Sequence, residues 1–334
     1  MPTLSDVAKI AGVGVMSVSR VVNGTRRVSP STERKVREAL RQVGYVPNEA
    51  ARILKGQPAH VLGLIVPDLS NPFFATCANA FHETAWRAGY LTLMASSFHD
   101  EEVESRITEI MVSRRVAGIA AIPSGSRDDH FAQVQESGIP IVSLDRPFQR
   151  VEADTLVVDN RPAARFATKH LIEHGHRNIL CVAEAEMTFT KRERVEGYSE
   201  AMRRAKLPVR ISLVDGLSRK LSDQLDLALK TRPKVSAVFA INDVLAVGVL
   251  KQLRKLSIAI PDEIALIAFD DFDAATLVRP TITVVRQPVA DLGRKAAAVL
   301  LDRLNNPKRI EASEIVLKTK LIVRESCGCS IKKE

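Results

Sequence analysis

The sequence predicts a small all-α head that contains a helix-turn-helix, followed by an α/β core of two doubly wound, parallel-sheet subdomains. Three observations carry this prediction. The first two dozen residues fit two short amphipathic helices joined by a glycine-bearing turn. From residue 61 onward, apolar segments typical of buried parallel strands alternate with helical stretches. These segments number about ten, too many for one modest doubly wound sheet, so two such units facing each other across a cleft are expected.

The helix pair spans residues 4–11 and 15–23, and Gly12 suits the left-handed conformation that such a turn requires. Each helix has one apolar face, formed by Val7, Ala8 and Ala11 in the first and by Val18, Val21 and Val22 in the second. The opposite face of the second helix carries Val15, Met16, Ser17 and Arg20. A helix of this kind can enter the major groove of DNA, where arginine contacts guanine and apolar side chains contact thymine methyl groups. The alternative for Met16 is a place in the core of the head.

The charge distribution supports DNA as the partner. The chain of 334 residues has a formal net charge of +9, and residues 1–58 contain ten lysines and arginines against four acidic residues. A basic head on a nearly neutral body is typical of proteins that bind the phosphate backbone. No secretion signal is recognisable at the start, and no apolar run approaches the roughly 18 residues of a membrane helix. We therefore expect a cytoplasmic protein that does not associate with membranes.

A third helix and a short helical segment complete the N-terminal part. Ser29 and Pro30 favour the start of the third helix and Gly44 favours its end. Residues 48–55 can form about two helical turns, starting at Asn48. A helix this short is marginal in water, so it needs a partner, either its twin in a dimer or DNA. The alternative is a plain linker.

In the core, the predicted strands are residues 61–66, 90–95, 117–122, 140–144, 155–158, 178–183, 210–214, 235–241, 264–269 and 281–285. The predicted helices include residues 73–88, 101–114, 161–174, 194–205, 218–230, 243–256 and 288–304. Open α/β sheets bind ligands at the carboxyl ends of their strands. The residues expected there are Phe73, Phe74, Asp145, Asn242, Asp243 and Asp270, with Thr190 in a loop and Arg194 at the start of the helix that follows.

These side chains suit a sugar, because carboxylate, guanidinium and amide groups bind hydroxyls while an aromatic face covers the apolar side of the ring. The alternative for Phe73 and Phe74 is a role in the core or in a subunit interface. Lys191 and Arg192 nearby would suit an acidic sugar or a sugar phosphate, or they point to solvent.

Two other classes of protein fit less well. A nucleotide-dependent enzyme would need a glycine-rich phosphate loop, but the turn after residues 61–66 lacks glycine, and no catalytic grouping is evident. A transported-solute receptor would lack the basic head. Cys327-Gly328-Cys329 could be a metal or redox pair, but the sequence shows no second ligand cluster, so we expect reduced thiols and neither a metal nor a cofactor.

A set of short motifs, in register along nearly the whole chain, resembles the lac repressor (LacI/GalR) family. The motifs are Val18-Ser19-Arg20-Val21-Val22-Asn23, Gly44-Tyr45-Val46-Pro47-Asn48, Ala51-Arg52-Ile53-Leu54, Gly63-Leu64-Ile65-Val66-Pro67, Asn71-Pro72-Phe73-Phe74, His174-Gly175-His176-Arg177, Asn242-Asp243 and Ile267-Ala268-Phe269-Asp270-Asp271. The resemblance implies a head over residues 1–46, a hinge helix and linker over 47–59, and a periplasmic-binding-protein-like core over 60–334. Within the core it implies an N-subdomain of about 60–158 and 287–320 and a C-subdomain of about 159–286 and 321–334.

The resemblance also implies roles for individual residues. The DNA-contacting positions are Thr3, Leu4, Val15, Met16, Ser17, Ser19, Arg20, Asn23, Asn48, Ala51, Leu54 and Lys55. Paired hinge helices would lie in the minor groove with Leu54 as an apolar wedge that opens a base step and bends the duplex. Arg194 and Asp270 would anchor the effector beside Asp145 and Asn242. Gly14 departs from the family pattern, in which serine or threonine commonly caps the reading helix, so we expect slightly looser binding.

The expected function is therefore a dimeric repressor of carbohydrate-utilisation genes. Its expected partners are a near-palindromic operator in double-stranded DNA and a sugar or sugar acid as effector. A dimer is favoured over a tetramer because the chain stops soon after Arg324-Glu325-Ser326, without a long heptad tail. The alternative is a regulator of the same family that responds to a nucleobase-like ligand or to a protein co-regulator.

Overall fold

The computed structural model describes residues 2–23, 28–45, 60–125, 127–214, 223, 226–227, 229, 232–307 and 311–329. The chain divides between Ala59 and His60 into two compact units. The predicted hinge helix, with Asn48, Ala51, Leu54 and Lys55, lies outside the described residues. None of the helices in the described ranges is both long enough and apolar enough to cross a membrane.

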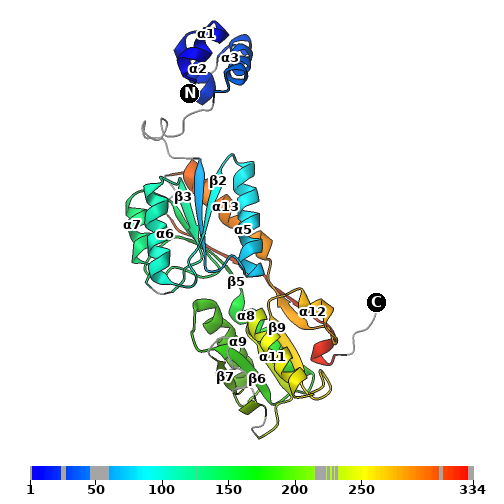
Figure 1. The fold of residues 1–334 in the computed structure, drawn as a ribbon. Helices are drawn as coiled ribbons and strands as arrows, with labels where there is room; N and C mark the ends of the chain where they lie inside the picture. The colour runs from blue at the N-terminus through cyan, green and yellow to red at the C-terminus, as the bar shows by residue number, and fades with distance from the viewer. Residues whose placement is uncertain are drawn as a thin grey trace. The chain divides into compact units, whose positions relative to one another are not determined.

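The N-terminal unit contains the predicted helix-turn-helix (Figure 1): α1 spans Leu4–Ala11, α2 spans Val15–Asn23 and α3 spans Pro30–Val43. Gly12 ends α1 at φ +63°, the left-handed conformation that its sequence position requires. The Gly14 carbonyl accepts the first hydrogen bond of α2, 2.8 Å from the Ser17 amide nitrogen. Val7, Val18 and Val36 are fully buried and join the three helices into one small core.

The ends of α3 confirm the capping predictions. The Ser29 hydroxyl accepts a hydrogen bond from the Thr32 amide at 3.2 Å, and Pro30 occupies the first turn, where its missing N–H costs nothing. At the other end, Gly44 adopts φ +64° and its N–H bonds back to the last turn.

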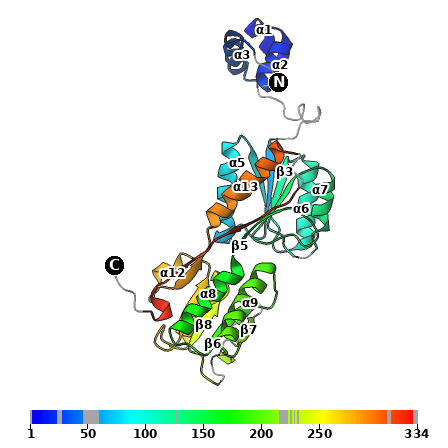
Figure 2. The same cartoon turned by 180° about the vertical axis from the view of Figure 1, so that it is seen from behind.

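The C-terminal unit contains two six-stranded sheets. The first sheet has the order β11-β5-β4-β3-β1-β2, and every neighbouring pair is parallel. Its strands are β1 Val61–Val66, β2 Leu91–Ser96, β3 Gly118–Ala121, β4 Ile141–Leu144, β5 Asp154–Val158 and β11 Glu314–Leu317. Helices α5 (Pro72–Arg87) and α13 (Val289–Asn305) pack together on one face, as Figure 2 shows, and α6 (Glu101–Ser113) and α7 (Asp129–Glu136) cover the other.

The second sheet has the order β12-β10-β9-β8-β6-β7 and is parallel except for the pair β10–β12. Its strands are β6 Ile179–Glu184, β7 Ile211–Val214, β8 Ala237–Ala240, β9 Ala265–Phe269, β10 Thr283–Arg286 and β12 Lys320–Ile322. The accompanying helices are α8 Asn160–Glu173, α9 Phe189–Arg204, α11 Asp243–Lys255, α12 Ala274–Leu277 and the 3-10 turn η1 Glu325–Cys327.

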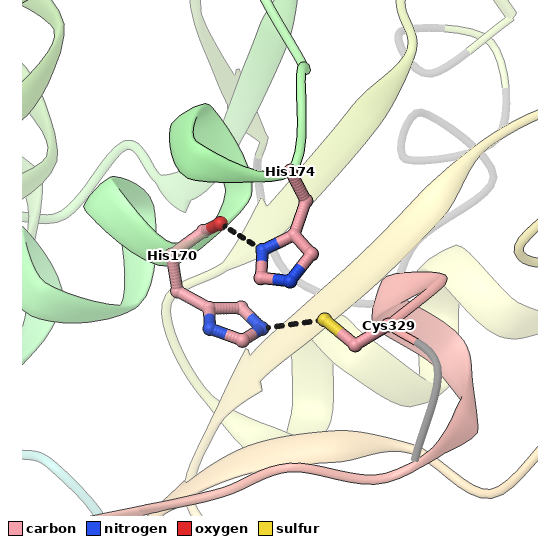
Figure 3. Close-up of side chains that lie close together, drawn as sticks. All are labelled: His170, His174 and Cys329. Carbon is pink, nitrogen blue, oxygen red and sulfur yellow. Dashed lines mark hydrogen bonds between the residues drawn. The ribbon is translucent and has the colours of Figure 1, made fainter. Parts of the chain in front are cut away.

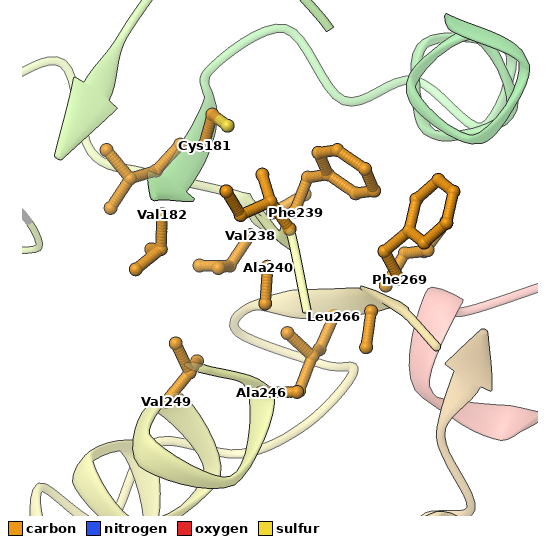
Figure 4. Close-up of a cluster of buried hydrophobic side chains, with 14 of the residues drawn as sticks. Cys181, Val182, Val238, Phe239, Ala240, Ala246, Val249, Leu266 and Phe269 are labelled. Atoms are coloured by element: carbon orange, nitrogen blue, oxygen red, sulfur yellow. The ribbon is translucent and has the colours of Figure 1, made fainter. Parts of the chain in front are cut away.

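Burial on both faces of the second sheet explains why the sequences of its strands are continuously apolar. Phe239, Leu266 and Phe269 are fully buried, and Val249 of α11 packs onto the same cluster (Figure 4). Helices on both faces leave no side of the central strands in contact with water. The chain passes between the two sheets three times, after β5, after β10 and between β11 and β12.

Several elements of the structure were not predicted from the sequence, and one predicted helix begins at a different residue. Helix α9 begins at Phe189, so the predicted loop that contains Thr190 is helical and Arg194 lies in the second turn. The start was misread because the polar segment 188–192 lacks an apolar stripe, whereas its lysine and arginine are good helix formers. Strands β11 and β12 and helix α7 were not predicted. The two strands are short and lie at or near sheet edges, where exposed charged side chains interrupt the apolar pattern. Most of the predicted helix 218–230 lies outside the described residues.

Candidate DNA-reading helix and effector cleft

Helix α2 presents an apolar surface to solvent. Met16 is 68% exposed and Val15 is 45% exposed, whereas Val18 on the opposite side is fully buried. The alternative that Met16 belongs to the core of the head is therefore wrong. Ser17, Ser19 and Arg20 are half-buried on the same helix. A small domain gains nothing in stability from exposed apolar side chains, so this surface fits recognition rather than folding.

Three other predicted DNA-contacting residues, Thr3, Leu4 and Asn23, lie at the ends of the first two helices. The Thr3 side chain accepts a hydrogen bond from the Asp6 amide and the Asp6 carboxylate accepts one in return from the Thr3 amide, which forms a capping box on α1. Leu4 is half-buried against the core of the head. Asn23 is the last residue of α2.

The candidate effector site begins with two aspartates at the carboxyl ends of parallel strands. Asp145 follows β4 at φ +62°, and Asp270 follows β9 at φ +73°. Positive φ angles are uncommon for residues other than glycine and cost of order 1 kcal/mol each. Aspartate adopts this conformation more readily than most residues, and it turns the chain sharply at the carboxyl end of one strand in each sheet.

Arg194 is the centre of a buried polar network. Its Nη1 lies 3.4 Å from Asp270 Oδ2 and donates to the Ile241 carbonyl at 2.9 Å, while its Nε donates to Asn160 Oδ1 at 2.8 Å. The guanidinium carbon lies 3.8 Å from the centre of the Phe269 ring. These contacts fix the guanidinium in one place with 5% of the residue exposed.

The two sheets meet at a cavity of about 140 Å³ that contains every predicted effector residue. The predicted residues that line it are Phe73, Phe74, Asp145, Thr190, Arg194, Asn242 and Asp270. Some of them also serve the fold. Phe74 belongs to the core around α5, and Asn242 caps α11 by accepting a hydrogen bond from the Leu245 amide at 2.8 Å.

The cavity also contains charged and polar residues that the sequence analysis did not select. Arg146 and Gln287 are the most informative, because Arg146 Nη1 and Gln287 Oε1 are buried without a hydrogen-bond partner. Buried polar atoms are normally paired, so these two atoms are free to bind a ligand. Both residues follow strands, β4 and β10, so extending the strand-end argument by one or two residues would have found them. Lys191, also in the lining, pairs with Glu184 at 2.5 Å.

Burial changes the ionisation of the acidic groups in the cleft. It raises the pKa of Asp270 to about 6, although Arg194 and the hydrogen bond from Gln287 oppose this shift. Burial also raises the pKa of Asp243. On the other side of the cavity, burial lowers the pKa of His99, and Arg146 and Lys191 add to that effect. Each shift reflects charge removed from water and held close to where a polar ligand would bind.

A larger cavity of about 750 Å³ lies along α8 and α9. Its lining comes mainly from the sides of these two helices, including Phe166 and Lys169, and no strand end contributes a buried, unpartnered polar atom there. The smaller cavity between the sheets is therefore the better candidate for a specific polar ligand.

Comparison with known proteins follows this division of the chain. Residues 3–48 match the family described as bacterial regulatory proteins, lacI family, and residues 168–327 match the periplasmic binding protein-like domain. Over 329 residues the chain is 32% identical to the HTH-type transcriptional regulator DegA of Bacillus subtilis, with 97% of each chain covered. The chain belongs to the lacI family of bacterial regulatory proteins.

Similar solved structures agree with the assignment of this chain to the lacI family. It is 31% identical to a transcriptional regulator CelR–cellobiose complex, with a TM-score of 0.72 and with 98% of this chain and 100% of that chain covered. The lac repressor dimer bound to operator and the anti-inducer ONPF has the same fold, with a TM-score of 0.84 at 22% identity and coverage of 98% and 99%. This lacI-family protein is a DNA-binding transcriptional regulator of the repressor type, and its relatives are regulators rather than enzymes.

Proposed function

We propose that this regulator represses carbohydrate-utilisation genes as a homodimer, and that a sugar or sugar acid in the cleft between the sheets controls its affinity for a near-palindromic operator. The observation that carries the proposal is the polar lining of the 140 Å³ cavity. It combines two aspartates held at positive φ with the buried, unpartnered Arg146 Nη1 and Gln287 Oε1.

The chemistry of the lining favours a polyhydroxylated ligand. Asp145, Asp270 and Arg194 supply charged hydrogen-bonding groups, and the rings of Phe73 and Phe74 lie edge-to-face with their centres 5.2 Å apart beside them. Hydroxyl groups satisfy such acceptors and donors, and a ring carbon face packs on an aromatic side chain. Arg146 would add a site for a carboxylate, which suits a sugar acid. The similar CelR structure contains cellobiose, in agreement with this class.

The effector is best tested by thermal unfolding of the full chain with a panel of sugars, sugar acids and sugar phosphates. A ligand at about one hundred times its dissociation constant adds about 2.7 kcal/mol of stability. A ligand that raises the melting temperature should also change operator affinity in a fluorescence anisotropy titration. Nucleobases and cell extract fractions complete the panel. A response to these alone would contradict the sugar proposal in favour of a nucleobase-like effector or a protein co-regulator.

For DNA recognition, we assign base contacts to the exposed face of α2 and assign the minor-groove wedge to Leu54. Arg20 is the residue for a guanine contact, since a bidentate arginine–guanine pair gives about 1–3 kcal/mol of discrimination. Met16 and Val15 offer only apolar contacts. Selection from a random-sequence DNA library should therefore give a near-palindromic site with a guanine in each half-site. The Arg20→Ala variant should no longer prefer guanine over the other bases at that position.

The surface beside β2 supports a homodimer. Trp86 at the end of α5 is 62% exposed, and Leu91 and Leu93 on β2 are 53% and 38% exposed. Strand β2 ends the order of its sheet, and native sheets rarely leave such an apolar edge uncovered. Aromatic residues, tryptophan above all, are enriched where protein surfaces bind each other. We propose that a second copy of the chain covers this patch.

The patch gives a direct prediction. Leu93→Glu is expected to raise the dimer dissociation constant at least about 10-fold, since it places a charge in a desolvated interface. Sedimentation velocity at several concentrations measures this shift. Leu213→Glu is the matched control, because Leu213 is 48% exposed on β7, the edge strand of the other sheet. If Leu213→Glu rather than Leu93→Glu dissociates the dimer, the interface lies elsewhere.

A further inference from the structure

Metal-binding side chains from two distant parts of the chain meet beside α8. His170, His174 and Cys329 each direct one potential ligand atom to the same place, and these atoms lie within 4.8 Å of one another (Figure 3). Cys329 Sγ is 3.0 Å from His170 Nε2. Cys327 adds a second thiol, with its Sγ 3.0 Å from that of Cys329. The cysteine pair thus has the second ligand cluster that the sequence analysis did not find.

Helix α8 positions the two imidazoles. His170 lies in its last turn and His174 caps it, so the four-residue spacing brings both rings to one face, with centroids 4.4 Å apart. His174 Nδ1 bonds to the His170 carbonyl at 2.7 Å, and that bond requires the proton on Nδ1. Nε2 of His174 then has a free lone pair. This is the outer-shell arrangement that orients histidine ligands in metal sites.

The C-terminal segment positions the two sulfurs. Cys327 ends the 3-10 turn η1 and is fully buried, and Gly328 turns the chain at φ +75° so that Cys329 returns toward the histidines. Metals bind cysteine in its thiolate form, so an ion held here would displace the thiol protons.

The geometry fits a tetrahedral zinc ion. Zn–S bonds of about 2.3 Å and Zn–N bonds of about 2.0–2.1 Å place the ligand atoms of a tetrahedron roughly 3.3–3.8 Å apart. The Sγ–Sγ and Sγ–Nε2 distances of 3.0 Å, and the greatest separation of 4.8 Å among the ligand atoms of His170, His174 and Cys329, bracket these values. Shifts of about 1 Å would bring the ligand atoms of His170, His174 and Cys329 to those separations, and Cys327, whose Sγ lies beside that of Cys329, supplies the fourth ligand.

We propose that His170, His174, Cys327 and Cys329 form a structural zinc site that fastens the C-terminal segment to the end of α8. On binding, the ion replaces the thiol protons, which pass to solvent, and two thiolates neutralise its double charge. Two sulfurs and two imidazoles select zinc over magnesium or calcium, which prefer oxygen ligands.

The zinc site is separate from the effector cleft, so this inference does not depend on the proposed effector. His174 lies five residues before β6 begins at Ile179, which places the zinc site at the amino end of that strand. The effector cavity lies at the opposite edge of the same sheet, where Glu184 ends β6 and Asn242 and Asp270 follow β8 and β9. The ion would stabilise the C-subdomain rather than contact the ligand.

The test uses the tag-free full chain, reduced and freed of metal with a chelator. Cobalt(II), which takes the place of zinc, is expected to give the intense visible bands of a tetrahedral complex and a near-ultraviolet thiolate charge-transfer band, saturating at one ion per chain. Zinc should then displace the cobalt and raise the melting temperature. Cys329→Ser should lower zinc affinity at least about 100-fold, and His174→Gln at least about 10-fold.

Two control variants replace a cysteine and a histidine that lie outside the proposed zinc site. Cys77→Ala and His82→Gln change side chains of α5 and should leave both the spectrum and the affinity unchanged. His174 is exposed, so His174→Gln should fold normally and its loss of affinity cannot be ascribed to unfolding. A cobalt complex without the thiolate band would overturn the proposal, and so would a Cys329→Ser protein that binds zinc as tightly as the parent.

Discussion

Asp270→Asn is expected to weaken effector binding about 100-fold while making the protein more stable at neutral pH. The carboxylate of Asp270 lines the cavity and forms the ion pair with Arg194. A hydrogen bond to a charged group contributes about 1.5–3 kcal/mol, and the amide loses that charge. Calorimetric titration with the effector found in the thermal panel measures the affinity, and in the operator assay the response should move to about 100-fold higher ligand concentration.

The gain in stability follows from the raised pKa. Burial holds the pKa of Asp270 at about 6 in the folded chain, against 3.8 for the free group. Between those pH values the folded state binds more protons than the unfolded state, so the free energy of unfolding decreases as pH rises through this window. A shift of about two pH units corresponds to about 3 kcal/mol, and the side chain is only 14% exposed, so solvent screens it little.

Urea unfolding of both proteins at pH 4 and pH 7 tests this prediction. Asparagine carries no charge at either pH, so the decrease in stability between them should be smaller in the variant by up to about 3 kcal/mol. The same urea measurements on Asp145→Asn show how the other aspartate of the cavity affects the pH dependence of stability. Equal pH dependence in Asp270→Asn and the parent would show that Asp270 ionises normally. Unchanged effector affinity would remove it from the site.

Arg194→Ala is expected to lower the free energy of unfolding by about 3–5 kcal/mol, because the change leaves buried polar partners without a donor. Asn160 Oδ1, the Ile241 carbonyl and the Asp270 carboxylate all bind this guanidinium. Urea unfolding at pH 7 measures the loss. When Arg194→Ala is introduced into the Asp270→Asn variant, it should lower the free energy of unfolding by less, because no buried carboxylate is then left unpaired. The difference between the two losses is the coupling energy of Arg194 and Asp270.

The same helix supplies a matched control. Arg203 lies on α9 and pairs with Glu196 at 2.8 Å, but the two side chains are 60% and 36% exposed. Exposed ion pairs contribute about 0–1 kcal/mol, so Arg203→Ala should be almost neutral. A comparable loss for both variants would mean that the helix, rather than the network around Arg194, determines the cost.

Local patterns in the sequence were enough to predict much of this protein. The apolar faces around Val7 and Val18, the caps at Ser29 and Gly44, and the long apolar strands all depend on neighbours within a few residues. The strand-end rule likewise located Asp145 and Asp270, because parallel strands expose their carboxyl ends on one edge. Charge and helix pattern together indicated DNA as the partner.

The sequence by itself therefore determined the fold class, the helix that we propose to read DNA and the strand ends that line the candidate effector cavity. The tertiary structure alone decided how side chains far apart in the chain combine. It brought Arg146 and Gln287 into the cavity with unpartnered atoms, and it placed Cys329 against His170, 159 residues away. Periodicity describes which face of an element is buried, whereas contacts between elements depend on how the sheets and helices pack in three dimensions.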